Sequence, residues 1–354
     1  MTCWQISSFD KIYVVRCAYS QAREISVSLE VLQARKKEKR RMEFTHIPVL
    51  AEECMEGLNI RPDGVYVDGT AGGGGHSYLI ASRLSDKGRL ISLDRDPDAV
   101  AAATERLSGF GNAQVIHSNY SQLRRVLDEL EIDAVDGILM DLGVSSYQLD
   151  EGSRGFSYHL DAPLDMRMSK EGMSAADIVN TYSEQELARI IFEYGEEKFS
   201  RRIAGNIVKE RAVRPVETTF QLADIIRNSV PQKARREKNP CKKTFQAIRI
   251  AVNGELEHLS QGLDDAFGSL KAGGRLAVIT FHSLEDRLVK QRFAGWCRGC
   301  ICPPDFPQCV CGRKPQGNLV NKKPIEANEK ELERNNRSRS AKLRVIERSA
   351  EADG

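Results

Sequence analysis

Short apolar runs alternate with amphipathic segments from residue 65 onwards. Short apolar runs bounded by turn residues are typical of buried strands, whereas apolar residues at every third or fourth position are typical of helices. The expected strands cover 65–68, 90–94, 113–117, 137–141, 274–281 and 343–346. The expected helices cover 76–84, 96–107 and 121–130, and a later one ends near Leu270. This alternation predicts an α/β fold with a parallel sheet.

The sheet pattern is interrupted between residues 145 and 245. Apolar spacing predicts helices there, and no segment has the alternation of a strand. The expected helices cover 174–180, 183–194, 199–211 and 219–230, with Ser174, Ser183 and Thr219 as N-caps. We expect an inserted all-α subdomain at 145–245 that divides one α/β domain into parts at 42–144 and 246–348. The inserted subdomain should lie over the carboxyl edge of the sheet, where open α/β folds bind ligands.

The two ends of the chain do not share this pattern. Residues 1–41 end in the basic run 35–41 and are expected to form a disordered tail, and 349–354 form a second tail. The first tail is interpreted either as a basic arm that touches RNA or as a solvated extension, including one read from an upstream start codon.

Charge and hydropathy narrow the class of protein. The 52 Lys and Arg residues nearly balance the 50 Asp and Glu residues, so any attraction to nucleic acid must come from local basic patches. Candidate patches are 233–238 with 242–243, and 334–344. No apolar stretch approaches the roughly 20 residues of a membrane span, and no signal peptide is evident, so we expect a cytoplasmic protein that does not contact membranes.

Five of the nine cysteines lie close together in a loop at 297–311. They are Cys297, Cys300, Cys302, Cys309 and Cys311. Paired C-x-C elements suit zinc, although the spacing matches no common zinc finger. A loop of reduced thiols is the alternative, and disulfides are the third possibility. Whether a metal binds here stays open.

A glycine-rich loop follows the first strand and opens the first helix. Asp68, Gly72 and Gly74 fit D-x-x-x-G-x-G, the methyltransferase form of such a loop. A dinucleotide fingerprint would place its third glycine at Ser77 or Tyr78, so it is incomplete. A carboxylate at Asp68 would also repel a pyrophosphate, whereas it would attract the cationic groups of S-adenosylmethionine. The loop therefore favours a methyltransferase over a dehydrogenase.

Three aspartates end successive parallel strands. Asp68, Asp94 and Asp141 should meet at one edge of the sheet. Asp94 can accept hydrogen bonds from ribose hydroxyls, and Tyr120, after the third strand, can flank an adenine. Together with the glycine loop, these residues predict a cofactor site.

Several long motifs resemble the MraW-type ribosomal RNA small-subunit methyltransferase H family. They are the segments 45–50, 68–77, 93–97, 140–150, 154–158, 161–168, 280–287 and 337–344. The resemblance covers about residues 43–348 and implies a Rossmann-like class I methyltransferase. It also implies cofactor contacts at Gly74, Gly75, His76, Asp94, Tyr120, Asp141 and Gln148.

The resemblance further implies the reaction: methyl transfer from S-adenosylmethionine to N4 of a cytidine in the decoding region of 16S ribosomal RNA. Whether free RNA or the 30S subunit is the substrate, and whether the protein forms a homodimer, stay open. The alternatives are a DNA amino-methyltransferase and a non-catalytic RNA-binding assembly factor. A dehydrogenase is the third.

Catalysis of this reaction requires acceptors that hold the weakly nucleophilic amine. Amino methyltransferases often use a turn with two prolines after the fourth strand, but 141–144 reads DLGV. Our hypothesis is that Asp141 holds the amine, with His282 and Asp286 as second candidates. Phe156 and Tyr158 are candidates for stacking on the target base, and their alternative role is in the core of the insertion.

Overall fold

The computed structural model describes residues 48–145, 148, 152–237, 239–303, 306, 308 and 310–350, without the side chains of 234, 236 and 237. The expected tail at 1–41 and the end of the expected tail at 349–354 lie outside these residues. In the described part of the chain, no helix has both the length and the apolar character needed to cross a bilayer.

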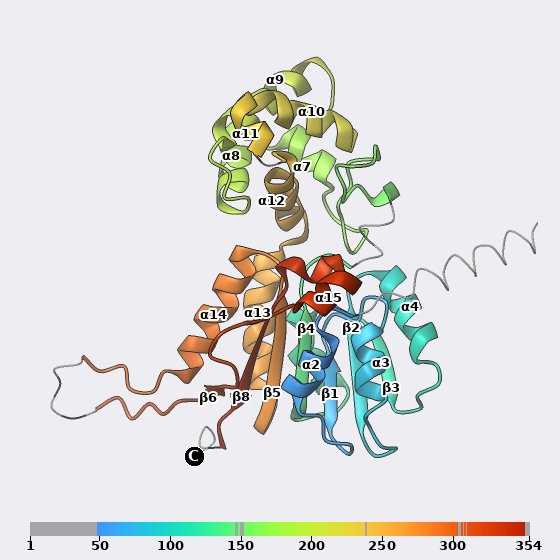
Figure 1. Ribbon diagram of the computed structural model, residues 1–354, viewed down its shortest axis with the longest axis vertical. Coiled ribbons are helices and arrows are strands. Elements are labelled where there is room, and N and C mark those ends of the chain that lie inside the picture. The colour runs from blue at the N-terminus through green and yellow to red at the C-terminus, as the bar shows by residue number, and fades with distance from the viewer. Residues whose placement is uncertain are drawn as a thin grey trace, which may run out of the picture. The chain divides into compact units, whose positions relative to one another are not determined.

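One sheet organises the described residues (Figure 1). Its strands are β1 (Val65–Asp68), β2 (Arg89–Asp94), β3 (Ala113–His117), β4 (Val135–Asp141), β5 (Leu270–Thr280), β6 (Gly317–Leu319), β7 (Ile325–Glu326) and β8 (Lys342–Arg348). The order is β3-β2-β1-β4-β5-β8-β6, and β7 pairs with β8 beside this path. Strands β1 to β5 are parallel, whereas β8 is antiparallel to β5 and to β6. This topology confirms the predicted Rossmann-like α/β fold.

Helices cover both faces of the sheet. One face packs against α2 (Ala51–Leu58), α3 (Gly75–Ala81) and the end of α4 (Pro97–Leu107). The other packs against α5 (Leu123–Glu129), α13 (Glu255–Gly268) and α14 (Ser283–Cys297). In β5, Leu276 and Val278 belong to the second core and Ala277 and Ile279 to the first, as the period of two in a strand requires.

Two strands and several helices were not predicted. Strands β6 and β7 are only three and two residues long and largely exposed, so they have no apolar alternation to detect. The longer helices that were not predicted are α2, α11 (Gln232–Glu237), α12 (Cys241–Asn253) and α14, and the shorter helical segments are η1 (Tyr120–Gln122), η2 (Gly152–Arg154), α15 (Glu329–Arg334) and η3 (Asn336–Ser340). Strand β5 also begins earlier than the predicted residue 274, at Leu270. Two consecutive glycines, Gly273 and Gly274, lie near its start.

The insertion is helical, as predicted. It contains α7 (Ala175–Thr181), α8 (Glu184–Glu193), α9 (Ser200–Val213), α10 (Thr219–Ser229), α11 (Gln232–Glu237) and α12 (Cys241–Asn253). Among its described residues, Pro163 and Thr218 form one isolated bridge and there is no strand. Ser174 and Ser183 are N-caps, but the cap of α10 is Thr218 and not Thr219. The hydroxyl of Thr219 is engaged elsewhere: its oxygen accepts the Ala162 amide N–H at 3.1 Å, and its hydrogen is donated to the carbonyl oxygen of Leu160 at 2.7 Å.

The predicted boundary at residue 245 falls inside α12. Phe245 and Ile248 of this helix are buried in the same apolar cluster as Ile203 and Leu222. The helix continues to Asn253 because its apolar spacing is unbroken, and Gly254, with φ of 57°, then turns the chain into α13. The helical subdomain therefore extends to the start of α13.

Candidate active site

The carboxyl ends of β1 and β4 meet where the strand order reverses, because β2 follows on one side and β5 on the other. Open parallel sheets bind ligands in the crevice at such a point. Asp68 ends β1 and Asp141 ends the adjacent strand β4, while Asp94 ends β2. The structure thus places the three predicted aspartates on three neighbouring strands.

Asp68 holds the glycine loop and is itself enclosed. Its side chain is fully buried, Oδ1 accepts the Thr70 amide N–H at 3.1 Å, and Oδ2 accepts the Ser77 hydroxyl at 2.6 Å. Burial raises the pKa of this carboxyl, and these hydrogen bonds oppose the rise. Asp68 therefore shapes the loop between β1 and α3, and it acts on a ligand only through its charge.

The loop glycines are required by backbone shape and by close packing. Gly72 and Gly74 have φ of 50° and 73°, which side chains rarely adopt. A Cβ at Gly75 would lie 2.8 Å from Cγ of Pro48. At Gly72, in contrast, the nearest atoms to such a Cβ are 3.9 Å away. The loop is closely packed at its helix end and has room for a ligand at Gly72.

Asp94 joins the glycine loop to the start of α4. Its Oδ2 accepts the Gly72 amide N–H at 2.8 Å, and its Oδ1 accepts the Asp96 amide N–H at 2.9 Å. Burial raises the pKa of Asp94 to about 6, against the lowering effect of these two bonds. Each carboxylate oxygen has a second acceptor position, so the group retains capacity for hydroxyl donors.

Tyr120 lies beside the glycine loop at the end of β3. A Cβ at Gly69 would be 3.2 Å from Cβ of Tyr120, and one at Gly262 of α13 would be 2.4 Å from its ring. The glycine in α13 thus makes room for the ring, a requirement that Tyr120 alone does not reveal. Burial raises the pKa of the phenol, so the hydroxyl stays protonated.

Asp141 has the least satisfied carboxylate of the three aspartates. Its backbone N–H donates to Oγ1 of Thr70 at 2.6 Å, but Oδ1 is buried without a hydrogen-bond partner among the described residues. The side chain is 25% exposed, so one side can be reached. Burial raises the pKa of Asp141 to about 8, and the charges of Asp68 and Glu285 add to this effect.

His76 is the neighbour of Asp141. Its Nε2 lies 3.7 Å from Oδ2 of Asp141, and both ring nitrogens are buried without a hydrogen-bond partner within the described ranges. Burial lowers the pKa of His76 to about 4, so the imidazole is neutral at physiological pH. An unsatisfied imidazole beside an unsatisfied carboxylate is costly in a folded chain, and such a cluster marks a binding site.

Both polar atoms of the Gln148 side chain form hydrogen bonds with other protein groups. Its Nε2 donates to Oδ2 of Asp96 at 2.7 Å, and its Oε1 accepts the Ser145 amide N–H at 2.9 Å. Arg154 donates to the same oxygen of Asp96, so this fully buried carboxylate is neutralised by the arginine. Gln148 thus lies beside the switch point as part of a network that ties the insertion to the N-terminus of α4.

His282, the second candidate for holding the amine, is the N-cap of α14. Its Nδ1 accepts the Glu285 amide N–H at 3.4 Å, and its Nε2 lies 3.1 Å from Oε1 of Glu285. Burial alone would raise the pKa of Glu285, but His282 and Arg249 lower it, so the carboxylate is anionic. The predicted Asp286 is paired with Arg344 on β8 at 2.8 Å.

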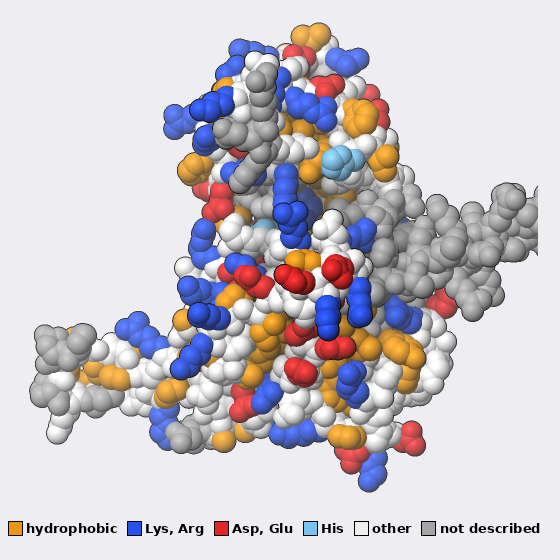
Figure 2. Space-filling model, viewed as in Figure 1, with side chains coloured by type: hydrophobic (Ala, Val, Ile, Leu, Met, Phe, Trp, Pro, Cys, Tyr) orange, Lys and Arg blue, Asp and Glu red, His pale blue; other side chains and the backbone are white. Residues whose placement is uncertain are grey.

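The candidates for RNA contact are divided between core and surface. Phe156 is buried in the core of the helical subdomain, and Tyr158 is half-buried with its ring 5.4 Å from that of Phe245. The structure therefore places Phe156 in the core and not on a stacking surface. Figure 2 shows Lys and Arg side chains on the helical subdomain and along α14, where Arg287 and Lys290 are exposed.

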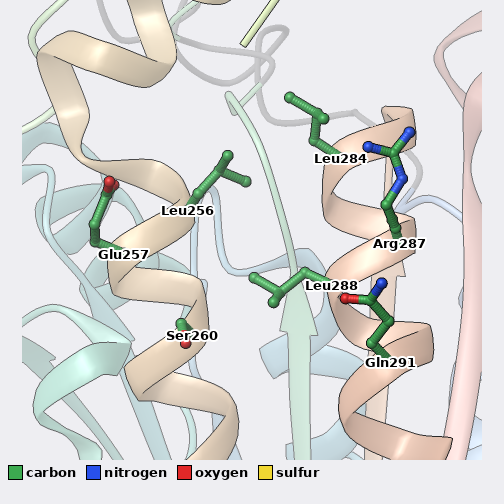
Figure 3. A pocket seen from close by; sticks show the side chains of 7 residues that line it. All are labelled: Leu256, Glu257, Ser260, Leu284, Arg287, Leu288 and Gln291. Atoms are coloured by element: carbon green, nitrogen blue, oxygen red, sulfur yellow. The ribbon is translucent and has the colours of Figure 1, made fainter. Parts of the chain in front are cut away.

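A groove of about 320 Å³ separates α13 from α14. Leucines and polar side chains from both helices line it (Figure 3). Arg287 at its rim pairs with Glu196 of the helical subdomain at 2.8 Å. None of the residues that line the groove is among the predicted cofactor contacts.

Two important residues of this region were not predicted. The Asp96 carboxylate accepts hydrogen bonds from Gln148 and Arg154. The Asn253 side chain donates to the carbonyl oxygen of Met166 at 2.8 Å and accepts the Met168 amide N–H at 2.9 Å. Asp96 is recognisable in sequence only as an N-cap before a proline, and Asn253 only as the residue before a helix-ending glycine. Their partners are distant in the chain, so local patterns could not identify these roles.

Comparisons with known proteins agree with this geometry. The sequence profile described as the MraW methylase family matches residues 43–349. A protein of Clostridium botulinum strain Kyoto, named ribosomal RNA small subunit methyltransferase H, is 57% identical over 86% of this chain and 99% of its own. A protein of the same name from Lachnospira eligens is 56% identical over 87% of this chain and 98% of its own.

A solved structure titled as an rRNA methylase from Streptococcus thermophilus was also matched. It is 11% identical, covers 84% of this chain and 93% of that chain, and has a TM-score of 0.37. With so low a score, the fold assignment rests on the sheet order of the chain itself.

Proposed function

Because the chain belongs to the MraW methylase family, we propose that it transfers a methyl group from S-adenosylmethionine to small-subunit ribosomal RNA. We further propose that the acceptor is the exocyclic N4 of a cytidine in the decoding region. The observation that carries the proposal is the partly exposed, unsatisfied carboxylate of Asp141 at the switch point, beside the glycine loop.

The residues present fit S-adenosylmethionine. Buried polar atoms without protein partners on His76 and Asp141 lie next to a loop that leaves room at Gly72. Asp94 retains acceptor positions for ribose hydroxyls, and Tyr120 is held beside the loop where it can flank an adenine. When bound, the cofactor supplies an electrophilic methyl group and a positive charge, which three neighbouring aspartates favour. Gly74 and Gly75 contribute backbone shape, and Gln148 holds Asp96.

Asp141 suits an amine acceptor better than a hydroxyl or carbon acceptor. The N4 amine of cytosine carries two N–H donors, and an ionised carboxylate oxygen accepts one of them. That hydrogen bond orients the nitrogen and draws electron density toward it, so the lone pair becomes available. As the N4 lone pair takes the methyl group, the methyl–sulfur bond breaks and its electron pair stays on sulfur, which becomes a neutral thioether. The surplus N4 proton moves to Asp141, whose raised pKa makes it a competent base.

Carbon methylation at C5 of cytosine is disfavoured by the state of Cys54. Such chemistry needs a cysteine thiolate that adds to the ring. Cys54 is fully buried, and burial first, then the charge of Asp141, raises the pKa of its thiol well above the ordinary value. This thiol therefore stays neutral and enclosed.

The test is transfer of labelled methyl from S-adenosylmethionine to small subunits that lack the modification, followed by nuclease digestion and mass spectrometry. We expect N4-methylated cytidine with the wild type and with Asp128→Asn, which removes a surface carboxylate paired with Arg124 on α5. We expect a loss of about 10²- to 10⁴-fold in turnover with Asp141→Asn.

Parallel reactions with naked 16S RNA, 30S subunits and duplex DNA separate the alternatives. Label on DNA and none on RNA would indicate a DNA amino-methyltransferase. Cofactor binding without transfer to any polymer would indicate a non-catalytic assembly factor. Label at C5 of cytosine would contradict the assigned role of Asp141.

A further inference from the structure

The described parts of the loop between α14 and β6 extend away from the sheet (Figure 1). Its large apolar side chains are exposed: Ile301 and Phe306 at 52%, and Val310 at 74%. Its two legs are close at the base, where the Gln316 amide donates to the carbonyl oxygen of Trp296 at 2.8 Å. These exposed side chains contribute little apolar burial, so the described contacts between the two legs are polar.

Three cysteines from the two legs converge in this loop. Sγ atoms of Cys300, Cys302 and Cys311 all lie within 4.8 Å of one another. The Sγ atoms of Cys300 and Cys311 are 3.7 Å apart, far beyond the roughly 2.05 Å of a disulfide bond. Four sulfurs bound tetrahedrally to zinc at about 2.3 Å have neighbours about 3.8 Å apart. The separation fits shared metal coordination.

Each of the three sulfurs also accepts a backbone N–H. The Cys302 amide donates to Sγ of Cys300 at 3.4 Å, the Val310 amide to Sγ of Cys302 at 3.4 Å, and the Ile301 amide to Sγ of Cys311 at 3.5 Å. Hydrogen bonds of this kind stabilise the thiolate, the form that binds metals. The backbone is thus arranged for three negative sulfurs, although the loop is largely exposed.

We propose that Cys300, Cys302 and Cys311 bind one zinc ion that staples the two legs of this loop. Zinc suits the set because it favours thiolate ligands and tetrahedral geometry, and three thiolates leave one position for a further ligand. Binding releases the three thiol protons, without any change of oxidation state. The site lies in a different part of the fold from the crevice, so it serves structure and not methyl transfer.

Cys297 provides a matched control within the same segment. It packs against the apolar core between α13 and α14, and burial raises the pKa of its thiol. Two residues separate it from Cys300 in sequence, yet it is not among the three converging sulfurs. Cys309 also belongs to the cysteine-rich loop of the sequence and lies outside the described residues.

The experiment measures zinc per chain by mass spectrometry of metals in the full-length protein, purified with reductant and a zinc buffer. We expect one zinc in the wild type and in Cys297→Ser, and loss of that zinc when Cys300→Ser, Cys302→Ser and Cys311→Ser are combined. Equal zinc in the triple variant and the wild type would overturn the proposal, as would iron in place of zinc.

A second measurement on the wild type alone does not depend on variants that fold. Removal of zinc with a chelator and addition of Co²⁺ should produce the intense visible bands of tetrahedral cobalt bound by thiolates. Absence of these bands, or a Cys300–Cys311 disulfide in the metal-free protein under reducing conditions, would overturn the assignment. The methyl-transfer assay is not a readout here, so failure of the proposed function leaves this test unaffected.

Discussion

Replacement of Asp141 by asparagine should make the protein more stable while it lowers the turnover of methyl transfer about 10²- to 10⁴-fold. The Asp141 carboxylate destabilises the folded protein because its Oδ1 has no hydrogen-bond partner among the described residues. Asp68 and Glu285 also place like charges nearby. Burial is the largest cause of the raised pKa, about 8 against an ordinary value of 3.8. An asparagine occupies the same space without the charge.

The sign and size of the effect follow from proton linkage. Between pH 3.8 and about 8 the folded chain keeps a proton on Asp141 that the unfolded chain has lost, so the free energy of unfolding falls as pH rises. Each pH unit costs about 1.4 kcal/mol, so the full gap between the two pKa values would amount to about 6 kcal/mol. Because the side chain is 25% exposed, we expect about 2–4 kcal/mol at pH 8 and above.

The assay is urea unfolding of wild type and Asp141→Asn across this pH range. The difference in free energy should favour the variant and grow with pH by about 1 kcal/mol per unit, then level off above pH 8. Asp128→Asn, at a surface carboxylate, should differ from wild type by less than about 0.5 kcal/mol throughout. A difference that is independent of pH, or a variant less stable at pH 8, would refute the reasoning.

Three further outcomes are expected. With subsaturating subunits, the rate of methyl transfer should rise nearly tenfold per pH unit up to about pH 8, because the base must be ionised Asp141. A rate that does not change with pH over this range would exclude that role. Gly74→Ala should cost about 1–2 kcal/mol in urea unfolding because φ is 73° and Ala103 is close, whereas Gly111→Ala, in open space, should be nearly neutral. Arg154→Met should cost about 3–5 kcal/mol because it leaves the buried Asp96 without its cation, and an unchanged urea midpoint would contradict this.

Local patterns predicted the elements whose stability comes from local periodicity. The strand 65–68 and the strand 113–117 were predicted with the bounds of β1 and β3, and Ser174 and Ser183 cap helices as expected. Alternating burial in strands and side-chain capping are properties of a few neighbouring residues. They can therefore be detected without knowledge of the tertiary structure.

Features that depend on distant partners could not be predicted in the same way. Thr218 and Thr219 are equivalent as caps in sequence, and only their partners in the folded chain distinguish them: Thr218 accepts the Gln221 amide N–H, whereas Thr219 binds the backbone of Leu160 and Ala162. The predicted boundary at 245 falls inside α12, a helix that shares its apolar core with helices that precede it. The motif containing Gln148 indicated the correct region, but its partner Asp96 is visible only in the folded chain.

Asn253 has a consequence for the order in which the chain folds. It ties the end of the helical subdomain to Met166 and Met168 near its beginning, and its carbonyl oxygen accepts Nη1 of Arg95 at 2.9 Å. Strands β4 and β5 pair although the whole subdomain separates them in sequence, and such distant pairings are slow to form. If the subdomain folds first and closes at Asn253, the ends of β4 and β5 are brought together before they pair. The loop that remains to be closed is then short, and its entropic cost is correspondingly small.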